Sequence, residues 1–159
     1  MSLARFVQRS AELGVTVDVR EMESTTHTAE EAAAAVGCPV GAIVKSLVFL
    51  AGDVPLIVLA SGQNRVDTGV LGAALGSAVR MADAKTVKAA TGYSIGGVPP
   101  FGHTGRIRTV MDEDLLAYRQ VWAAAGAATA VFPIAPDELA RIAAAEVLPV
   151  AAAEASAAR

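Results

Sequence analysis

A stretch of fourteen residues, GYSIGGVPPFGHTG from Gly92 to Gly105, constrains the fold more than any other part of the sequence. It holds five glycines and two prolines. Glycine widens the range of backbone conformations and proline narrows it, so this mixture cannot follow one regular set of dihedral angles. The stretch, called here the glycine/proline loop, is therefore predicted to be a long loop with regular elements on either side. Its backbone N–H groups can bind an anion or a developing oxyanion; the alternative is that the glycines serve only to turn corners.

The rest of the chain alternates between short helical and strand patterns. Apolar spacing and capping residues predict helices over residues 3–13, 28–35, 67–75, 83–90 and 136–145. Alternating or β-branched runs predict strands over residues 15–19, 42–51, 54–60, 79–82, 107–111, 121–125 and 129–134, with a turn or short helix at 112–116. Hairpins mixed with single helices predict an α+β fold, a mixed α/β arrangement with a mostly antiparallel sheet flanked by helices. We expect one domain over residues 1–150 and an alanine-rich tail over 151–159.

Composition excludes several classes of protein. The chain has 159 residues, 53% of them hydrophobic, and a net charge of −3, which excludes disorder as the main state. The single Cys38 cannot form an internal disulfide. Charges at Arg5, Arg9 and Glu12 leave no room for the apolar centre of a signal peptide, and a run of about 20 predominantly apolar residues is absent. We therefore expect a soluble, cytoplasmic protein with no membrane partner.

Charge is unevenly distributed along the chain. Five cations and one acid, Asp83, lie between positions 80 and 108, so this segment carries +4 and the rest of the chain carries −7. Phosphate contacts depend on the local field, so the segment predicts a surface for a polyanion; the alternative is a solvated surface with uneven charge. The cations are Arg80, Lys85, Lys88, Arg106 and Arg108.

Lys45 is a second candidate for chemistry. It stands inside an apolar run, and strand alternation places it on one face with Leu47 and Phe49, while Ser46 takes the opposite face. A lysine that faces a core is costly unless it has a partner or lines a cavity; the alternative is a strand-end lysine that reaches solvent. The two histidines and one cysteine lack metal-ligand spacing, and the common phosphate-loop, dinucleotide and hydrolase motifs are absent, so we expect no metal or other cofactor.

Two segments together resemble a known family. They are Lys45-Ser46-Leu47-Val48-Phe49 and, later, Thr91-Gly92-Tyr93 with Gly96-Gly97-Val98-Pro99-Pro100-Phe101-Gly102-His103. This combination resembles the YbaK/EbsC family of prolyl-tRNA editing domains, and the likeness extends from the first predicted helix to the helix at Asp137. It implies a single domain with a barrel-like mixed sheet and a substrate pocket. It also implies metal-free hydrolysis of the ester that joins a wrong amino acid to the tRNA 3′ end, assisted by groups of the substrate.

The resemblance implies roles for individual positions. The catalytic positions that it implies are Lys45, Gly96, Pro100, Gly102 and His103. The substrate-binding positions that it implies are His27, Ser46, Gly97, Phe101 and Asp112, and the five cations between positions 80 and 108 would contact tRNA. Ser46 departs from the family, whose members often carry threonine or asparagine there. This change bears on which amino acid is removed.

The leading hypothesis is a trans-editing aminoacyl-tRNA deacylase. Its substrate would be mischarged tRNA, Cys- or Ala-tRNA(Pro), and prolyl-tRNA synthetase would be a further partner. One methylene is worth only about 1 to 3 kcal/mol of discrimination, so amino acids close in size to proline require a second, hydrolytic sieve. The alternative is a non-catalytic module of the same fold that binds tRNA ends, a nucleotide or a protein. A hydrolase of small aminoacyl esters is a third hypothesis, and the +4 segment argues against it.

Overall fold

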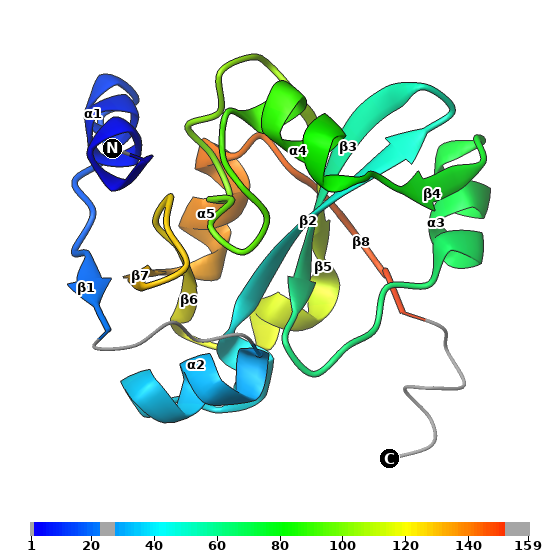
Figure 1. Cartoon of the computed structure of the whole chain (residues 1–159). Coiled ribbons are helices and arrows are strands. Elements are labelled where there is room, and N and C mark those ends of the chain that lie inside the picture. The colour runs from blue at the N-terminus through cyan, green and yellow to red at the C-terminus, as the bar shows by residue number, and fades with distance from the viewer. Residues whose placement is uncertain (1, 23–27, 152–159) are drawn as a thin grey trace.

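The computed structural model describes residues 2–22 and 28–151, and shows helices packed around two β-sheets (Figure 1). The helices are α1 (Ser2–Glu12), α2 (Ala29–Val36), α3 (Thr68–Leu75), α4 (Ala84–Thr91) and α5 (Pro136–Ile142), with 3₁₀ turns η1 (Val40–Ala42) and η2 (Glu113–Ala117). The strands are β1 (Arg20–Glu21), β2 (Val44–Ala51), β3 (Val54–Ser61), β4 (Val79–Met81), β5 (Arg108–Asp112), β6 (Val121–Ala124), β7 (Ala130–Ile134) and β8 (Glu146–Leu148). Within the described ranges, the helices are too short or too polar to cross a membrane.

The strands form a five-stranded sheet in the order β4-β2-β3-β5-β8 and a three-stranded sheet in the order β1-β7-β6. The β3–β5 and β5–β8 pairs are parallel and the remaining pairs are antiparallel. The α+β class and the mostly antiparallel pairing are confirmed. The barrel-like closure is not confirmed, because the strands divide into two sheets that meet at a single bridge between Ile43 and Trp122.

Local sequence signals place most of the helix ends. Thr28 accepts a hydrogen bond from the Glu31 N–H while the Glu31 side chain accepts one from the Thr28 N–H, which is the capping box expected at the start of α2. Asp67 and Asp83 cap α3 and α4 without the reciprocal bond, because their side chains accept N–H groups of the first turn. Helix α4 ends at Gly92, which adopts the left-handed conformation that glycine tolerates, and the glycine/proline loop begins there.

The structure differs from the sequence predictions at three short segments. Residues 15–19 were predicted as a strand, but Val15, Val17 and Val19 pack on the core without a ladder partner among the described residues, and pairing with β7 begins only at Arg20. Strand β8 was not predicted because its three residues carry little periodic signal; it forms because β5 offers a free parallel edge. Helix α5 ends at Ile142 rather than near residue 145 because the chain turns there to enter β8.

Strand β2 separates two apolar clusters. Val44 and Val48 pack into the larger cluster, which includes α1, the glycine/proline loop, β6 and β7. Phe49 packs into the smaller cluster beneath α3, and Leu47 lies against it. Because side chains alternate along β2, the Ser46 side chain lies on the side of the larger cluster and the Lys45 side chain lies on the opposite side.

Candidate active site

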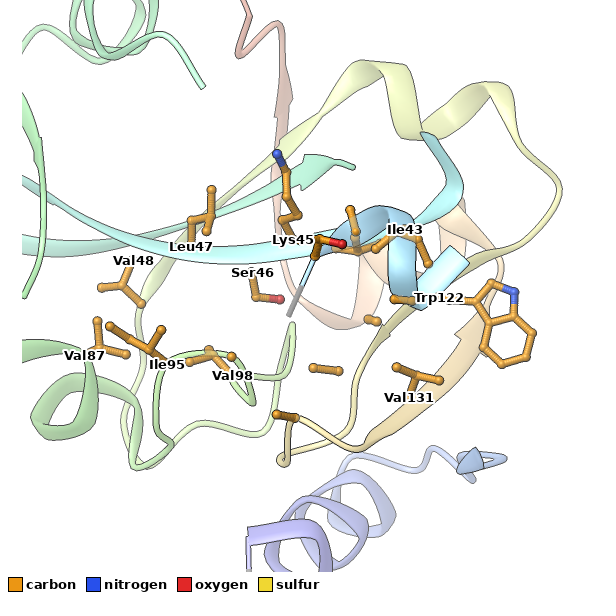
Figure 2. Close-up of a pocket in the computed structure, with 18 of the residues that line it drawn as sticks. Ile43, Lys45, Ser46, Leu47, Val48, Val87, Ile95, Val98, Trp122 and Val131 are labelled. Carbon is orange, nitrogen blue, oxygen red and sulfur yellow. The ribbon is translucent and has the colours of Figure 1, made fainter. Parts of the chain in front are cut away.

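A cavity of about 290 Å³ opens between β2, the β6–β7 hairpin, α4 and the glycine/proline loop (Figure 2). Helix α2 closes one side with Thr28 and two alanines. The walls are mostly aliphatic, and the larger side chains around the cavity are Ile43, Val48, Val87, Ile95, Val98, Trp122 and Val131. A space of this size and character fits a group as small as an amino acid.

Ser46 supplies a polar group to this apolar cavity. Figure 2 shows its side chain on the side of β2 that faces Ile95 and Val98. The Ser46 hydroxyl oxygen is buried and has no hydrogen-bond partner within the part of the chain that the structure describes. The hydroxyl is therefore free to bind a ligand.

Lys45 borders the cavity, but its side chain takes the opposite side of β2 from Ser46 (Figure 2). Its Nζ donates a hydrogen bond of 2.6 Å to the carbonyl oxygen of Asn64. Burial lowers the pKa of the Lys45 amine; the carboxylates of Glu30 and Asp112 raise this pKa, and the charge of Arg65 lowers it further. The amine is thus partly desolvated and lies across β2 from the cavity that Lys45 borders.

A buried polar cluster holds the carbonyl that anchors Lys45. Asp112 is 1% exposed, and one of its carboxylate oxygens accepts hydrogen bonds from the Ser61 N–H at 3.0 Å and from Asn64 Nδ2 at 2.9 Å. Its other oxygen accepts one from the Asp114 N–H at 3.0 Å. Strands β3 and β5 run in parallel, so their carboxyl ends bring Ser61 and Asp112 together. Asp112 therefore acts inside the protein, and its predicted substrate contact stays a prediction.

Asn64 was missed by the sequence analysis. It is 5% exposed, and its amide also donates to an Asp114 carboxylate oxygen at 2.7 Å. An asparagine in a polar segment after a strand gives no signal of burial, and only the packing of η2 against the end of β3 brings the two aspartates to it.

The first half of the glycine/proline loop forms one wall of the cavity. Gly96 lines it with a φ of +91°, a conformation that favours glycine. Gly97 allows a close approach, since a Cβ atom there would lie 2.9 Å from the Cα of Ala127. The Tyr93 hydroxyl ties the two halves of the loop together by donating to the Gly102 carbonyl at 3.0 Å.

Two arginines of α1 hold the ends of the loop. Arg5 donates to the Gly92 carbonyl at 2.8 Å, and Arg9 donates to the His103 carbonyl at 3.1 Å. Sequence analysis used these residues only to exclude a signal peptide, because contacts that join positions about ninety residues apart leave no local pattern. Helix α1 therefore sets the position of the loop.

The second half of the loop lies away from this cavity. Pro100, Phe101, Gly102 and His103 line a separate hollow of about 660 Å³ on the side of α1 and α5. Their placement separates them from Lys45, Ser46 and Gly96, so the structure does not bring the whole predicted catalytic set together. Their predicted roles in catalysis stay predictions. His27, predicted to bind substrate, lies outside the described residues.

Two of these residues have clear structural contacts. Phe101 is 3% exposed, and its ring packs 5.4 Å from that of Phe6 and 5.7 Å from that of Phe132, measured between centroids. The His103 ring lies with Nε2 at 2.7 Å from the carbonyl oxygen of Pro99. Burial lowers the pKa of His103, partly offset by the hydrogen bond to Pro99, so the neutral imidazole is favoured.

The predicted tRNA-binding cations fall into two groups. Arg80, Lys85 and Lys88 lie on β4 and α4, next to the cavity wall, whereas Arg106 and Arg108 line the hollow on the other side of the loop. Arg80 is paired with Asp53 at 3.3 Å, and Arg108 is paired with Glu146 at 2.8 Å. Lys85 and Lys88 are exposed, form no ion pair with the described residues, and lie on the helix whose Val87 lines the cavity.

Residues 23–142 match the family model of the aminoacyl-tRNA editing domain. The chain belongs to the aminoacyl-tRNA editing domain family. The match covers three quarters of the sequence and confirms the resemblance to the YbaK family that the lysine segment and the glycine/proline loop indicate. The cavity, Lys45, Ser46 and Gly96 all lie within the matched residues of this editing domain.

Several known proteins share the domain. YwhH, an uncharacterized protein of Bacillus subtilis (strain 168), is 32% identical over 123 residues, which cover 77% of this chain and 78% of YwhH. Proline–tRNA ligase of Nitratidesulfovibrio vulgaris (strain Hildenborough) is 33% identical over 90 residues, which cover 56% of this chain and only 16% of the ligase. The editing domain therefore corresponds to a small part of that enzyme.

Solved structures show the same architecture. A candidate trans-editing enzyme for prolyl-tRNA synthetase is 41% identical, with a TM-score of 0.91 over 95% of this chain and 97% of that one. The hypothetical protein APE2540 is 31% identical, with a TM-score of 0.84 over 92% of this chain and 98% of that one. Family and fold together support aminoacyl-tRNA deacylation as the activity of this editing domain.

Proposed function

We propose that this protein is a trans-editing hydrolase that removes a small, wrongly attached amino acid, alanine or cysteine, from tRNA(Pro). The observation that carries the proposal is the small aliphatic cavity between β2 and Gly96, inside a domain of the editing family. Action in trans is supported by the likeness to the candidate trans-editing enzyme along almost all of its length. The link to tRNA(Pro) is supported by that protein and by the matching segment of the proline–tRNA ligase.

The size of the cavity suits the task of a second sieve. The aminoacylation site of a synthetase that accepts proline also admits amino acids that are smaller or of similar size. Each methylene by which two substrates differ contributes only about 1 to 3 kcal/mol to the discrimination between them. A separate cavity of about 290 Å³ selects by a different criterion, because it accepts what fits and hydrolyses it. Its aliphatic walls favour a short side chain with little charge.

The proposed reaction requires little chemistry from the protein. A water oxygen attacks the acyl carbon and the ester bond to the ribose oxygen breaks; the proton that the water loses passes to that ribose oxygen as the amino acid leaves. Backbone N–H groups of the loop around Gly96 would stabilise the negative charge on the carbonyl oxygen, and one well-aimed donor contributes about 3 to 4 kcal/mol. The ribose hydroxyl of the substrate would orient the water, which suits a cavity where the Ser46 hydroxyl has no base beside it. No metal takes part in this proposal.

Lys45 would position the terminal nucleotide. Lys45 borders the cavity, and its amine, on the opposite side of β2 from Ser46, is fixed by the Asn64 carbonyl, so its charge is held in one place rather than on a freely moving chain. A fixed cation on the outer side of this strand would contact the ribose or phosphate while the acyl group enters the cavity. Lys85 and Lys88 on α4 would contact the adjoining phosphates.

The test is release of amino acid from Ala-, Cys- and Pro-charged tRNA(Pro), with Lys45→Ala measured alongside. We expect hydrolysis of a mischarged form, little hydrolysis of Pro-tRNA(Pro), and at least about a 100-fold loss in Lys45→Ala. Arg141→Ala, which removes an exposed cation on α5, is the control and should retain full activity. Full activity in Lys45→Ala would refute the role of the lysine, and no hydrolysis of any mischarged form would refute the function.

One observation favours a second candidate, a binding module without turnover. The side chains that line the cavity include no nucleophile hydrogen-bonded to a base within the described residues. Such a module would shift the mobility of tRNA on a gel without releasing amino acid. An esterase for small aminoacyl esters would instead hydrolyse them equally well with and without the tRNA body.

A further inference from the structure

The hollow of about 660 Å³ on the side of α1 and α5 is a second place where a ligand fits. Sites for small molecules commonly measure about 300 to 1,000 Å³, so this hollow has room for a ligand larger than an amino acid. The second half of the glycine/proline loop, the end of α1, the start of β5 and the turn between α5 and β8 surround it. None of the described residues that line the hollow also lines the cavity beside Ser46, so the hollow is a site of its own.

Arg9 on α1 lines the hollow with a guanidinium that is only partly bonded. Its Nη1 donates to the His103 carbonyl at 3.1 Å, which is its one hydrogen bond to the described residues. Its Nε is buried without a partner in that part of the chain, and no described acid forms an ion pair with it. A buried donor of a charged group is unfavourable without an acceptor, and an anion that supplies the acceptor removes this penalty. The planar guanidinium suits a phosphate or a carboxylate, which accepts two of its N–H groups at once.

Two more arginines make the hollow locally positive. Arg106 is exposed and has neither an ion pair nor a hydrogen bond within the described residues, whereas Arg108 is paired with Glu146 at 2.8 Å. The other acid among the lining residues, Glu12, is exposed and forms no ion pair with the described chain. Three arginines and two glutamates leave +1 at the hollow, although the whole chain carries −3. Arg9 and Arg106 therefore remain available to an anion.

His103 adds an acceptor to these donors. Its Nε2 lies 2.7 Å from the Pro99 carbonyl oxygen, which can only accept, so Nε2 carries the proton and Nδ1 of the neutral ring is an acceptor. Nδ1 has no hydrogen bond to the residues that the structure describes. The walls beside these polar groups are apolar and include Leu13, Ile107 and Ile142. A matching ligand therefore carries an anionic group, an apolar face and an N–H or O–H donor.

We propose that this hollow binds a nucleoside monophosphate. The phosphate pairs with Arg9 and Arg106, the flat base lies against the aliphatic walls, and an N–H or hydroxyl of the nucleoside donates to His103 Nδ1. A phosphate monoester carries about 1.5 to 2 negative charges at pH 7, so it matches two unpaired arginines better than a single carboxylate does. This inference goes beyond the deacylase function and does not depend on it.

The test is titration of the full chain with guanosine monophosphate, followed through the backbone amide NMR signals. This nucleotide has N–H donors on its base and is not the adenosine that ends a tRNA, so it does not imitate the substrate end. We expect shifts at Arg106, Ile107 and Ala143 around the hollow and none at Val48 and Val87 around the cavity. Guanosine without its phosphate, and inorganic phosphate alone, should each bind at least about 10-fold more weakly.

Three variants locate the bound phosphate. Arg106→Met removes an exposed cation without internal contacts, and it should weaken binding about 10-fold. Arg9→Met should weaken binding by a similar factor; because it also removes the bond to the His103 carbonyl, thermal unfolding checks that it is folded. Arg141→Met is the matched control, since Arg141 is an exposed cation of α5 that does not line the hollow, and it should keep the wild-type affinity.

Gel mobility of tRNA, with and without guanosine monophosphate, distinguishes two sources of the nucleotide. Undisturbed binding of tRNA would assign the hollow to a free nucleotide. Displacement of tRNA from the wild type that is lost in Arg106→Met would assign the hollow to a terminal nucleotide of an RNA.

The outcomes of the titration decide the proposal. An affinity that is unchanged in Arg106→Met, or shifts confined to the amides around the cavity, would overturn it. Inorganic phosphate that binds as tightly as guanosine monophosphate would also overturn it, because the nucleoside would then contribute nothing. Weaker binding in Arg9→Met and Arg106→Met, with the wild-type affinity kept in Arg141→Met, would support it whether or not the protein hydrolyses mischarged tRNA.

Discussion

Asp112 offers the strongest test of how the site is supported. Its buried carboxylate receives three hydrogen bonds, from the Ser61 N–H, the Asn64 amide and the Asp114 N–H, at 3.0, 2.9 and 3.0 Å. Sequence resemblance predicts a substrate contact for this residue, whereas the geometry places it behind Asn64, whose carbonyl anchors Lys45. Replacement of Asp112 should therefore damage stability directly and the site through Asn64.

The expected loss in the free energy of unfolding follows from the N–H donors that lose their acceptor. A hydrogen bond to a charged acceptor contributes about 1.5 to 3 kcal/mol, and a buried donor left unpaired costs a similar amount. In Asp112→Ala the Ser61 and Asp114 N–H groups lose their acceptor, while the Asn64 amide keeps its bond to the Asp114 carboxylate. We expect a loss of about 3 to 5 kcal/mol in the free energy of unfolding. This is a large share of the roughly 5 to 15 kcal/mol that holds a typical domain folded.

Asp112→Asn tests the same reasoning with a side chain of nearly the same shape. An amide keeps one acceptor oxygen, but its NH₂ group then faces at least one of the N–H donors, so we expect a loss of about 2 to 3 kcal/mol. Asp114→Asn is the matched control, because the Asp114 carboxylate accepts one bond from Asn64, which keeps its bond to Asp112; it should cost less than about 1 kcal/mol.

Urea unfolding, followed by circular dichroism, measures these differences. A loss below about 1 kcal/mol in Asp112→Asn, or one no larger than in Asp114→Asn, would refute the structural role. The carboxylate of Asp112 also raises the pKa of Lys45, so its removal should lower that pKa further. An NMR titration of the lysine gives the sign of this change independently of stability.

Three further predictions concern the glycine/proline loop. Gly97→Ala should cost about 1 to 3 kcal/mol, because the new Cβ would lie 2.9 Å from the Cα of Ala127, while Gly105→Ala, with open space around it, should be near neutral in the same thermal melt. The pKa of His103 is lowered in the folded protein, so the imidazole of the unfolded chain is protonated first as the pH falls below about 6.5, and the folded state loses stability. His103→Gln should therefore lessen the fall in melting temperature between about pH 7 and about pH 5. An unchanged fall would contradict this. Arg9→Met should speed amide hydrogen exchange in the loop, since it removes the bond to the His103 carbonyl, and unchanged exchange would show that the loop is held by other contacts.

The sequence alone determined most of the local structure. Thr28, Asp67 and Asp83 start helices because a short polar side chain can accept the N–H groups that a first turn leaves free. The glycine/proline loop is irregular because its residues demand different backbone conformations. Strand alternation put Lys45 and Ser46 on opposite sides of β2, as Figure 2 shows. These signals are local, so they can be read from neighbouring residues.

Only the tertiary structure decided which of these residues meet. The loop motif is continuous in sequence, yet Gly96 lines the cavity while His103 lines a separate hollow, because two arginines of α1 fix the ends of the loop. Asn64 gained its place from the parallel pairing of β3 and β5, which no local pattern announces. Strand β2 pairs with β4 only at residues 49–51, and the bridge to β6 lies at Ile43, just before the strand begins. Contacts between distant segments depend on the packing of whole elements, so the site became visible only when the chain was folded.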